Sequence, residues 1–284
     1  MTAHFMVIGN PIAHSKSPMT HQAFANQAGL DIRYARQLCP NDEASFIAVI
    51  EAFFNGGGIG ANVTVPFKQM AFDYCQKNGE LSNNAAAAGA VNTLYYKNEV
   101  LIGDNTDGQG LVNHMLSMDW QLTGANIAII GAGGAARGVI LPLIDAGVAS
   151  ITLANRTLVK AQDLIADLRE NNATIKAADI QSCETSALTG DFDIIINATS
   201  IGLTGDKLPL SDGLTCSKAY DMMYGKSLPF LSHFENKGAV TSDGFGMLLG
   251  QAALSFLLWT GFAADVNKAK TALQDPALGD RFWR

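Results

Sequence analysis

Residues 127–137 read IAIIGAGGAAR, a short apolar run followed at once by a glycine-rich turn. The apolar run is typical of a buried strand, and a helix pattern follows the turn. A G-x-G-x-x-A sequence between a strand and a helix is typical of a Rossmann-type dinucleotide-binding unit. Its glycines let the backbone approach a pyrophosphate, which the helix N-terminus attracts. We therefore predict a dinucleotide site here, with an unliganded glycine turn as the less favoured alternative.

The end of the next strand, residues 150–154, indicates which dinucleotide binds. In such units this strand end normally carries a carboxylate that accepts a bond from the ribose 2′-hydroxyl. The chain instead has Asn155-Arg156-Thr157, with Lys160 one turn later. A planar guanidinium suits a 2′-phosphate. The pattern predicts NADP(H) rather than NAD, and the alternative is a surface arginine without a ligand.

Residues 60–68 (GANVTVPFK) predict a second site. Val63 and Val65 alternate with Asn62 and Thr64, as in a half-buried strand. Proline is favoured at the first helical position, which makes Pro66 the expected helix start and places Lys68 in the first turn. The positive end of the helix there favours the neutral form of a lysine, and a lysine poised to exchange a proton is useful in catalysis. From this stretch alone, an ordinary strand–helix turn with a solvated lysine is the favoured interpretation.

The order of the elements predicts a two-domain α/β protein. Strands alternate with helices through both halves, which implies right-handed crossovers and a mostly parallel sheet. Residues 104–108 (DNTDG) form a polar hinge that is as readily a capped loop as a site. A long apolar helix after residues 242–247 breaks the alternation, so we expect it to complete the first domain. The predicted domains are residues 1–106 completed by 244–284, for substrate binding and catalysis, and residues 107–243, a Rossmann-type NADP-binding domain. We expect the active site in the cleft between them.

Composition excludes several classes of protein. The net charge of −7 argues against nucleic acid or an anionic membrane as a partner. The four cysteines are widely spaced, and the N-terminus lacks the features of a signal peptide. The longest nearly apolar run, residues 252–264, is too short to cross a bilayer. The five histidines are scattered without metal-ligand spacing. We predict a cytoplasmic protein with no metal site.

Taken together, these segments resemble the shikimate dehydrogenase family over nearly the whole length. The matching motifs are Gly9-Asn10-Pro11 with Ser15-Lys16-Ser17, Asn62 to Lys68, Gly89-Ala90-Val91-Asn92-Thr93, Gly103 to Gly108, Gly131 to Arg137, Asn155-Arg156-Thr157, Asn197-Ala198-Thr199-Ser200, and Asp243-Gly244 followed by Gln251. The resemblance implies reversible NADPH-dependent reduction of 3-dehydroshikimate to shikimate in aromatic amino-acid biosynthesis.

The resemblance also implies roles for individual residues. The catalytic pair would be Lys68 and Asp107. The residues that would bind substrate are Ser15, Ser17, Asn62, Thr64, Lys68, Asn92, Asp107, Tyr224 and Gln251. The residues that would bind the cofactor are Gly131, Gly133, Gly134, Ala135, Asn155, Arg156, Thr157, Lys160, Thr199, Met222 and Gly244.

The sequence leaves three points open. Lys160 stands where close relatives carry a second arginine, and lysine keeps the charge but loses the bidentate fork, so selectivity for NADP is expected to soften. A quinate/shikimate dehydrogenase of broader substrate and cofactor range is the nearest alternative. A non-catalytic regulator that binds the ring acid is the other, although retention of both Lys68 and Asp107 argues against it. The expected assembly is a monomer or a homodimer.

Overall fold

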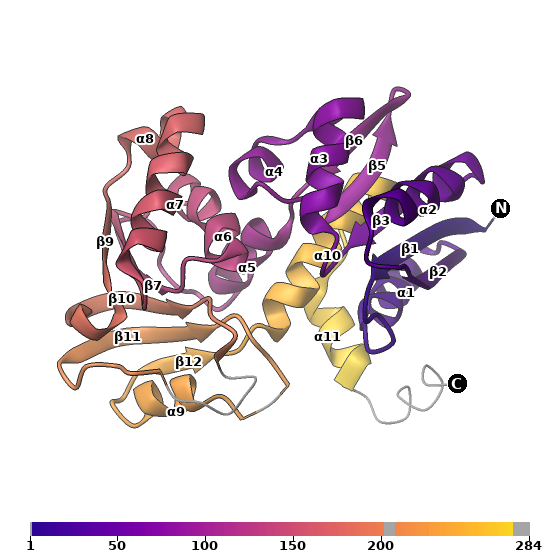
Figure 1. Ribbon diagram of the computed structural model, residues 1–284. Helices are drawn as coiled ribbons and strands as arrows, with labels where there is room; N and C mark the ends of the chain where they lie inside the picture. Colours follow the sequence, from indigo (N-terminus) through magenta and orange to yellow (C-terminus); the bar gives the residue numbers. More distant parts are fainter. Residues whose placement is uncertain (1, 202–207, 226, 275–284) are drawn as a thin grey trace. The chain divides into compact units, whose positions relative to one another are not determined.

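The computed structural model describes residues 2–201, 208–225 and 227–274 (Figure 1). These residues form two compact units, each described by itself below. The first unit contains the residues up to Gly110 together with those from Leu249 onward, and the second contains Leu111–Leu248. The predicted domain limits, residues 1–106 with 244–284 and residues 107–243, stay a prediction. Residues 275–284 lie outside the described residues.

The first unit is a six-stranded sheet with helices on both faces (Figure 1). Two of its helices, α5 and α10, have residues in both units. The elements are β1 (Ala3–Gly9), α1 (Ser17–Ala28), β2 (Ile32–Leu38), α2 (Glu43–Asn55), β3 (Gly60–Val63), α3 (Lys68–Asn78), β4 (Glu80–Leu81), α4 (Asn83–Ala88), β5 (Thr93–Lys97), β6 (Val100–Asp104), α5 (Asp107–Ser117), α10 (Phe245–Thr260) and α11 (Val266–Gln274).

The first sheet has the strand order β2-β1-β3-β5-β6-β4, with three parallel strand pairs and two antiparallel ones. Strand β1 pairs in parallel with β2 and β3, whereas β5 is antiparallel to both β3 and β6. Strands β5 and β6 form a hairpin, and Asn98 and Glu99 form its turn with φ values of 51° and 66°. Lys97 is the last residue of β5.

Apolar side chains cover both faces of this sheet. On one face Ile8 and Val63 pack with Phe46 of α2 and Phe67, which precedes α3. On the other face lie Phe5 of β1, Phe24 of α1, and Phe256 and Trp259 of α10. The long apolar helix therefore completes the first unit, as the sequence predicts.

The start of α3 differs from the expected one for a local reason. Pro66 lies in a turn closed by the Phe67 N–H donating to the Thr64 carbonyl (2.9 Å), so α3 begins at Lys68. Helix α1 begins at Ser17, with Lys16 at the N-cap position. After α3 the chain forms the short strand β4. Ser82 then caps α4 by accepting a bond from the Ala85 N–H (3.1 Å).

The second unit is a six-stranded sheet whose described strand pairs are all parallel. Its strand order, β12-β11-β10-β7-β8-β9, is that of a doubly wound dinucleotide-binding sheet. The elements are β7 (Asn126–Ile130), α6 (Gly134–Asp145), β8 (Ser150–Asn155), α7 (Leu158–Asn171), α8 (Ala173–Ala177), β9 (Ile180–Glu184), a 3₁₀ turn (Thr185–Ala187), β10 (Gly190–Asn197), β11 (Leu214–Asp221), α9 (Pro229–Glu235) and β12 (Val240–Ser242).

The strand order changes direction between β7 and β10 in the centre of the second sheet. Ligands of such sheets lie beyond the carboxyl ends of the strands at this point. The glycine-rich turn follows β7, and the polar residues after Asn197 follow β10. The fold therefore brings these two predicted cofactor segments to one place.

Candidate active site

Lys68 and Asp107 form an ion pair in the first unit. Lys68 is the first residue of α3 and Asp107 is the first residue of α5. The Lys68 Nζ lies 2.5 Å from Asp107 Oδ2, and the two side chains are 31% and 26% exposed. A half-buried pair of this kind remains accessible to a ligand while it is sheltered from bulk water.

Asn92 holds the second oxygen of the Asp107 carboxylate. Its Nδ2 donates to Asp107 Oδ1 (2.9 Å) and to the hydroxyl of Thr106 (3.1 Å). Its Oδ1 accepts from the Thr106 backbone N–H (3.0 Å) and from the hydroxyl of Thr93 (2.8 Å). Because the carboxylate is fixed at both oxygens, its orientation toward Lys68 is set by the fold.

The remaining polar residues of the 104–108 segment serve the loop itself. The carboxylate of Asp104 accepts bonds from the Ser82 hydroxyl and the Asn105 N–H. The amide of Asn105 donates to the Ala90 carbonyl (3.0 Å) and accepts from the Asp107 N–H (3.1 Å). The segment is therefore a structured loop that places Asp107 against Lys68. Its role as a functional site stays a prediction.

Asn62 and Thr64 lie at the carboxyl end of β3. The side chain of Asn62 is buried, and its two polar atoms bond to five protein groups. Thr64 is half-buried, and its methyl group lies against Gly9, where a Cβ would come within 2.6 Å of it. The hydrogen bonds of the Asn62 amide are therefore made within the protein. The roles predicted for Asn62 and Thr64 in substrate binding stay predictions.

Ser15 and Ser17 lie where β1 leads into α1. Their hydroxyls are 3.2 Å apart, and the Ser17 N–H donates to Ser15 Oγ (3.3 Å). Arg36 of β2 donates two bonds to the Ser15 carbonyl, from Nε (3.0 Å) and Nη2 (2.7 Å). The guanidinium therefore fixes the backbone that carries both serines.

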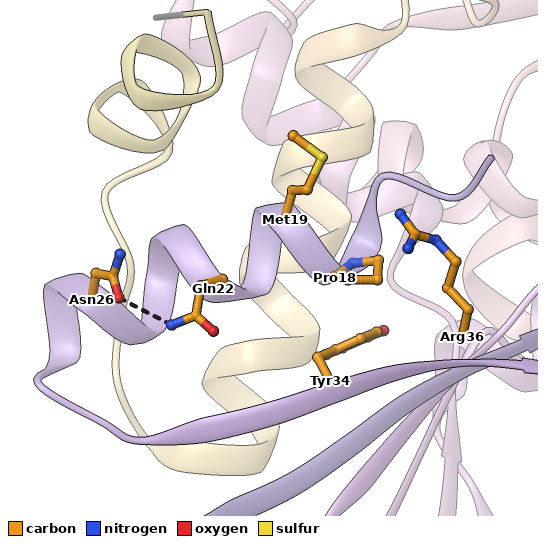
Figure 2. Close-up of a pocket in the computed structure, with 6 residues that line it drawn as sticks. All are labelled: Pro18, Met19, Gln22, Asn26, Tyr34 and Arg36. Carbon is orange, nitrogen blue, oxygen red and sulfur yellow. Dashed lines mark hydrogen bonds between the residues drawn. The ribbon is translucent and has the colours of Figure 1, made fainter. Parts of the chain in front are cut away.

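A cavity of about 410 Å³ opens beside this segment, between α1 and β2. Figure 2 shows Arg36 at one end of it near Pro18, and the Gln22–Asn26 amide pair at the other end. The lining residues are Pro18, Met19, Gln22, Asn26, Tyr34 and Arg36. None of these six is among the predicted site residues.

Gln251 is held close to the α5 backbone by two glycines. A Cβ on Gly110 would lie 2.6 Å from the Gln251 nitrogen, and a Cβ on Gly250 would lie 2.8 Å from the Gly110 carbonyl oxygen. The two helices therefore touch backbone to backbone at this level. Gln251 and Asp107 are positioned together because Gly110 follows Asp107 by less than one helical turn.

The glycine-rich turn of the second unit has the geometry that a phosphate requires. Gly131 has φ of 111°, a conformation that favours glycine, and packs against Ala198 and the methyl of Thr199. Among the described residues, no side chain caps α6, and a Cβ on Gly133 or Gly134 would have no atom within 4 Å. The open turn and the uncapped helix end fit a pyrophosphate.

The end of β8 carries exposed cations. The Asn155 amide donates to the Thr157 carbonyl (2.9 Å), which shapes the turn after the strand. Arg156, Thr157 and Lys160 are exposed around this turn. Two positive side chains and a hydroxyl at the surface fit the phosphate that distinguishes NADP from NAD.

Thr199, Met222 and Gly244 follow the carboxyl ends of β10, β11 and β12. The Asn197 amide oxygen accepts from the Thr199 N–H and hydroxyl, at 3.0 and 2.8 Å. A Cβ on Gly244 would lie 2.2 Å from the Met222 carbonyl oxygen, so this close approach requires glycine. Tyr224 is half-buried beside Phe245, and burial raises the pKa of its phenol. The fold gathers the predicted cofactor residues Thr199, Met222 and Gly244 at one edge of the sheet, and Tyr224, a predicted substrate residue, follows the end of β11.

Several polar residues of these sites give no signal in the sequence. In the first unit they are His21, Tyr34 and Ser255, which bond to Asn62. In the second unit Asp221 accepts a bond from the Asn197 amide (2.9 Å), and burial raises the pKa of its carboxyl. Each pair joins distant segments, and only the three-dimensional fold reveals it.

A Rossmann-type unit joined to a second α/β unit that holds a Lys–Asp pair defines a class, the two-domain dinucleotide-dependent oxidoreductases. Three family models match the chain and narrow this class. They are the shikimate dehydrogenase substrate binding domain over residues 7–94, shikimate/quinate 5-dehydrogenase over residues 91–203, and the shikimate 5′-dehydrogenase C-terminal domain over residues 244–274.

Known proteins are similar over the full length. The NADP(+) shikimate dehydrogenase of Psychrobacter arcticus is 61% identical over 288 residues, which cover 98% of this chain and 100% of that protein. The Ael1 enzyme from Pseudomonas putida is 34% identical with a TM-score of 0.87, over 96% of this chain and 99% of that one. The structure of Thermus thermophilus shikimate 5-dehydrogenase in complex with NADP(H) and shikimate is 27% identical with a TM-score of 0.81, over 95% and 97%. The chain belongs to the shikimate dehydrogenase family.

These comparisons confirm the resemblance and the two-domain α/β fold class that the sequence predicts. Across the described residues, no helix has both the length and the apolarity needed to cross a membrane. Within the same ranges, no three His, Cys, Asp or Glu side chains are grouped to hold a metal ion.

Proposed function

We propose that this chain catalyses the reversible NADPH-dependent reduction of 3-dehydroshikimate to shikimate in aromatic amino-acid (chorismate) biosynthesis. Full-length similarity to NADP(+) shikimate dehydrogenases supports the reaction. The observation that carries the proposal is the contact of 2.5 Å between Lys68 Nζ and Asp107 Oδ2 in a half-buried position. An acid–base pair of this kind suits proton transfer to a ring ketone.

Residues of the first unit bind the ring acid in this proposal. Ser15 and Ser17 of this unit bind its carboxylate through their adjacent hydroxyls. Tyr224, which belongs to the second unit, is also a substrate-binding residue in this proposal. The residues that face the ring hydroxyls are Asn62, Thr64, Asn92, Asp107 and Gln251. Asn62 contributes mainly through the position of its neighbours, because its amide is already bonded within the protein.

The catalytic step needs a hydride and a proton on the carbonyl group. NADPH, when bound, would supply the hydride for the carbonyl carbon of the substrate. Lys68 gives one proton from Nζ to the carbonyl oxygen, so that the ketone becomes an alcohol. Asp107, held by Asn92, keeps the Lys68 side chain in place before the transfer. In the reverse direction Lys68 takes the proton from the hydroxyl.

The second unit binds NADP(H) in this proposal. Gly131, Gly133, Gly134 and Ala135 lie against the pyrophosphate. The 2′-phosphate binds to Asn155, Arg156, Thr157 and Lys160. The nicotinamide pocket is lined by Thr199, Met222 and Gly244. The open glycine turn and the exposed cations at the end of β8 support this placement.

The second candidate function is a quinate/shikimate dehydrogenase of broader range. One of the family models that match the chain is named for both ring acids, and Lys160 softens selectivity for NADP. A regulator that binds the ring acid without turnover is the alternative from another class. Further parts of the proposal are a cytoplasmic location, a monomer or homodimer, and no nucleic-acid or membrane partner.

A cofactor-oxidation assay tests these possibilities together. NADPH and NADH are each supplied with 3-dehydroshikimate or 3-dehydroquinate, and the loss of absorbance at the reduced nicotinamide is followed. Turnover confined to NADPH and 3-dehydroshikimate supports the proposal. Comparable rates with NADH or 3-dehydroquinate favour the broader enzyme. Ligand binding without turnover under all four conditions favours the regulator.

A further inference from the structure

His21 is a fully buried histidine that the proposed reaction does not use. It lies on α1 with none of its surface exposed, and its ring stacks on Tyr34 (4.5 Å between centroids) and Trp259 (5.0 Å). Its Nε2 lies 3.1 Å from Asn62 Oδ1. Burial lowers the pKa of its imidazole to about 3, so the ring is neutral at physiological pH. A neutral ring in an apolar stack can serve as a fixed hydrogen-bond donor.

The partners of Asn62 decide which way its amide faces. On one side lies the Asn92 carbonyl, at 3.2 Å from Nδ2, and a carbonyl can only accept. The amide nitrogen must therefore face Asn92, and Oδ1 must face Tyr34 and His21. The Tyr34 hydroxyl donates to Oδ1 at 2.7 Å. Oδ1 is an acceptor, so the proton of the His21 ring is on Nε2.

The same amide connects His21 to the Lys68–Asp107 pair. Asn62 Nδ2 binds the Asn92 carbonyl, and the Asn92 side chain donates to Asp107 Oδ1 at 2.9 Å. Asp107 Oδ2 binds Lys68 Nζ. Hydrogen bonds therefore connect the His21 ring to Lys68 through Asn62, Asn92 and Asp107. Within Asn92 the connection passes from the backbone carbonyl to the side chain. The other ring nitrogen of His21, Nδ1, is buried and has no hydrogen-bond partner among the described residues, so the bond to Asn62 is the one that ties the ring to this network.

We propose that His21 is a positioning residue for the Lys68–Asp107 pair. Together with Tyr34 it fixes the amide of Asn62, which holds Asn92 in the place where it orients Asp107. The proposal rests on the proposed function, because it assigns Lys68 and Asp107 as the groups that transfer the proton. His21 touches neither substrate nor cofactor in this account and acts through Asn62.

Two substitutions separate the hydrogen bond from the volume of the ring. His21→Leu keeps an apolar side chain in the stack but removes the donor to Asn62. His21→Gln places an amide N–H near the position of Nε2 and restores the donor. We expect kcat with 3-dehydroshikimate and NADPH to fall on the order of tenfold in His21→Leu, in line with the loss of one hydrogen bond in a buried network. We expect His21→Gln to stay within about threefold of the parent chain, which allows for imperfect geometry of the restored bond.

A buried neighbour supplies the matched control. Phe24 lies on the same helix, is fully buried, and makes an edge contact with the His21 ring at 5.9 Å. Phe24→Leu should lower the free energy of unfolding without changing kcat or its pH dependence. His21→Leu should change both kcat and the pH dependence of kcat/KM while KM for NADPH stays the same. A merely structural role would make the two variants behave alike.

A second measurement does not depend on turnover. The ¹³C chemical shift of the Asp107 side-chain carboxyl, assigned by its loss in Asp107→Asn, reports the environment of that group. The shift should move in His21→Leu and return in His21→Gln. An unchanged shift in folded His21→Leu, or a kcat and pH profile equal to those of the parent chain, would overturn the proposal. If the parent chain itself fails to reduce 3-dehydroshikimate, the proposed function is wrong, and the carboxyl shift still decides whether His21 positions Asp107.

Discussion

Burial of His21 predicts a specific loss of stability in mild acid. The imidazole has a pKa of about 3 in the folded chain, against about 6.5 for an unperturbed histidine. Below pH 6.5 the unfolded chain binds a proton that the folded chain excludes, so acid favours unfolding. The stability that this group contributes is complete above pH 6.5 and is lost as the pH falls toward 3. Between pH 7 and pH 5 the loss from this one group is about 2 kcal/mol.

His21→Gln tests this value because glutamine does not titrate. Urea unfolding followed by circular dichroism gives the free energy of unfolding at pH 7 and at pH 5 for the parent chain and for the variant. Other titrating groups, including His233, whose pKa is also lowered by burial, contribute to both proteins and cancel in the comparison. The parent chain should lose about 2 kcal/mol more than the variant. Equal losses in the two proteins would refute the reasoning, because they would show that His21 takes up a proton in the folded state.

Three further changes test other parts of the molecule. Lys68→Ala should lower kcat roughly 10²–10⁴-fold with little change in KM, which is the usual effect of losing an acid–base group. A raised KM with kcat preserved would instead make Lys68 a binding residue. Arg156→Ala should weaken NADPH binding by roughly 10- to 150-fold, which corresponds to the loss of one charge-assisted hydrogen bond, and should weaken NADH binding much less. Calorimetric titrations with each cofactor measure both affinities. Equal losses for the two cofactors would count against a 2′-phosphate site. Gly60→Ala would place a Cβ 2.4 Å from the Trp259 ring. Overpacking of this kind costs about 1–3 kcal/mol, so a thermal melt should show a lowered Tm, and an unchanged Tm would contradict the packing described here.

The second unit was the easier part to predict from the sequence. Residues 127–137 specify a strand, a turn and a helix through contacts that are local, and the turn chemistry of glycine is visible in the letters themselves. The same unit also predicts that the residues after its second strand, β8, face the ribose of the cofactor, so the absence of a carboxylate there is informative. Helix α7 and strand β9 are not preceded by a comparable turn sequence, and their positions were not predicted from the sequence.

In the first unit the sequence indicates Lys68 and Asp107 but not what supports them. His21 and Asn62 are 41 residues apart, and Asn62 and Ser255 are 193 apart, so their hydrogen bonds follow from tertiary packing rather than from local pattern. The start of α3 was misplaced for a local reason, because the turn over residues 64–67 competes with the helix for the backbone of Pro66. Patterns of residue type reveal the groups that carry chemistry, whereas the groups that orient them become visible only when the chain is folded.

The backbone contact between Gly110 and Gly250 has a consequence for protein engineering. Substrate pockets are usually enlarged by trimming side chains, but neither glycine has a side chain to remove. Any replacement at Gly110 or Gly250 would separate the two helices and displace Asp107 and Gln251 together. Mutant libraries that seek a different ring acid should therefore leave both glycines unchanged and vary proposed substrate contacts that have a side chain to change, beginning with Thr64.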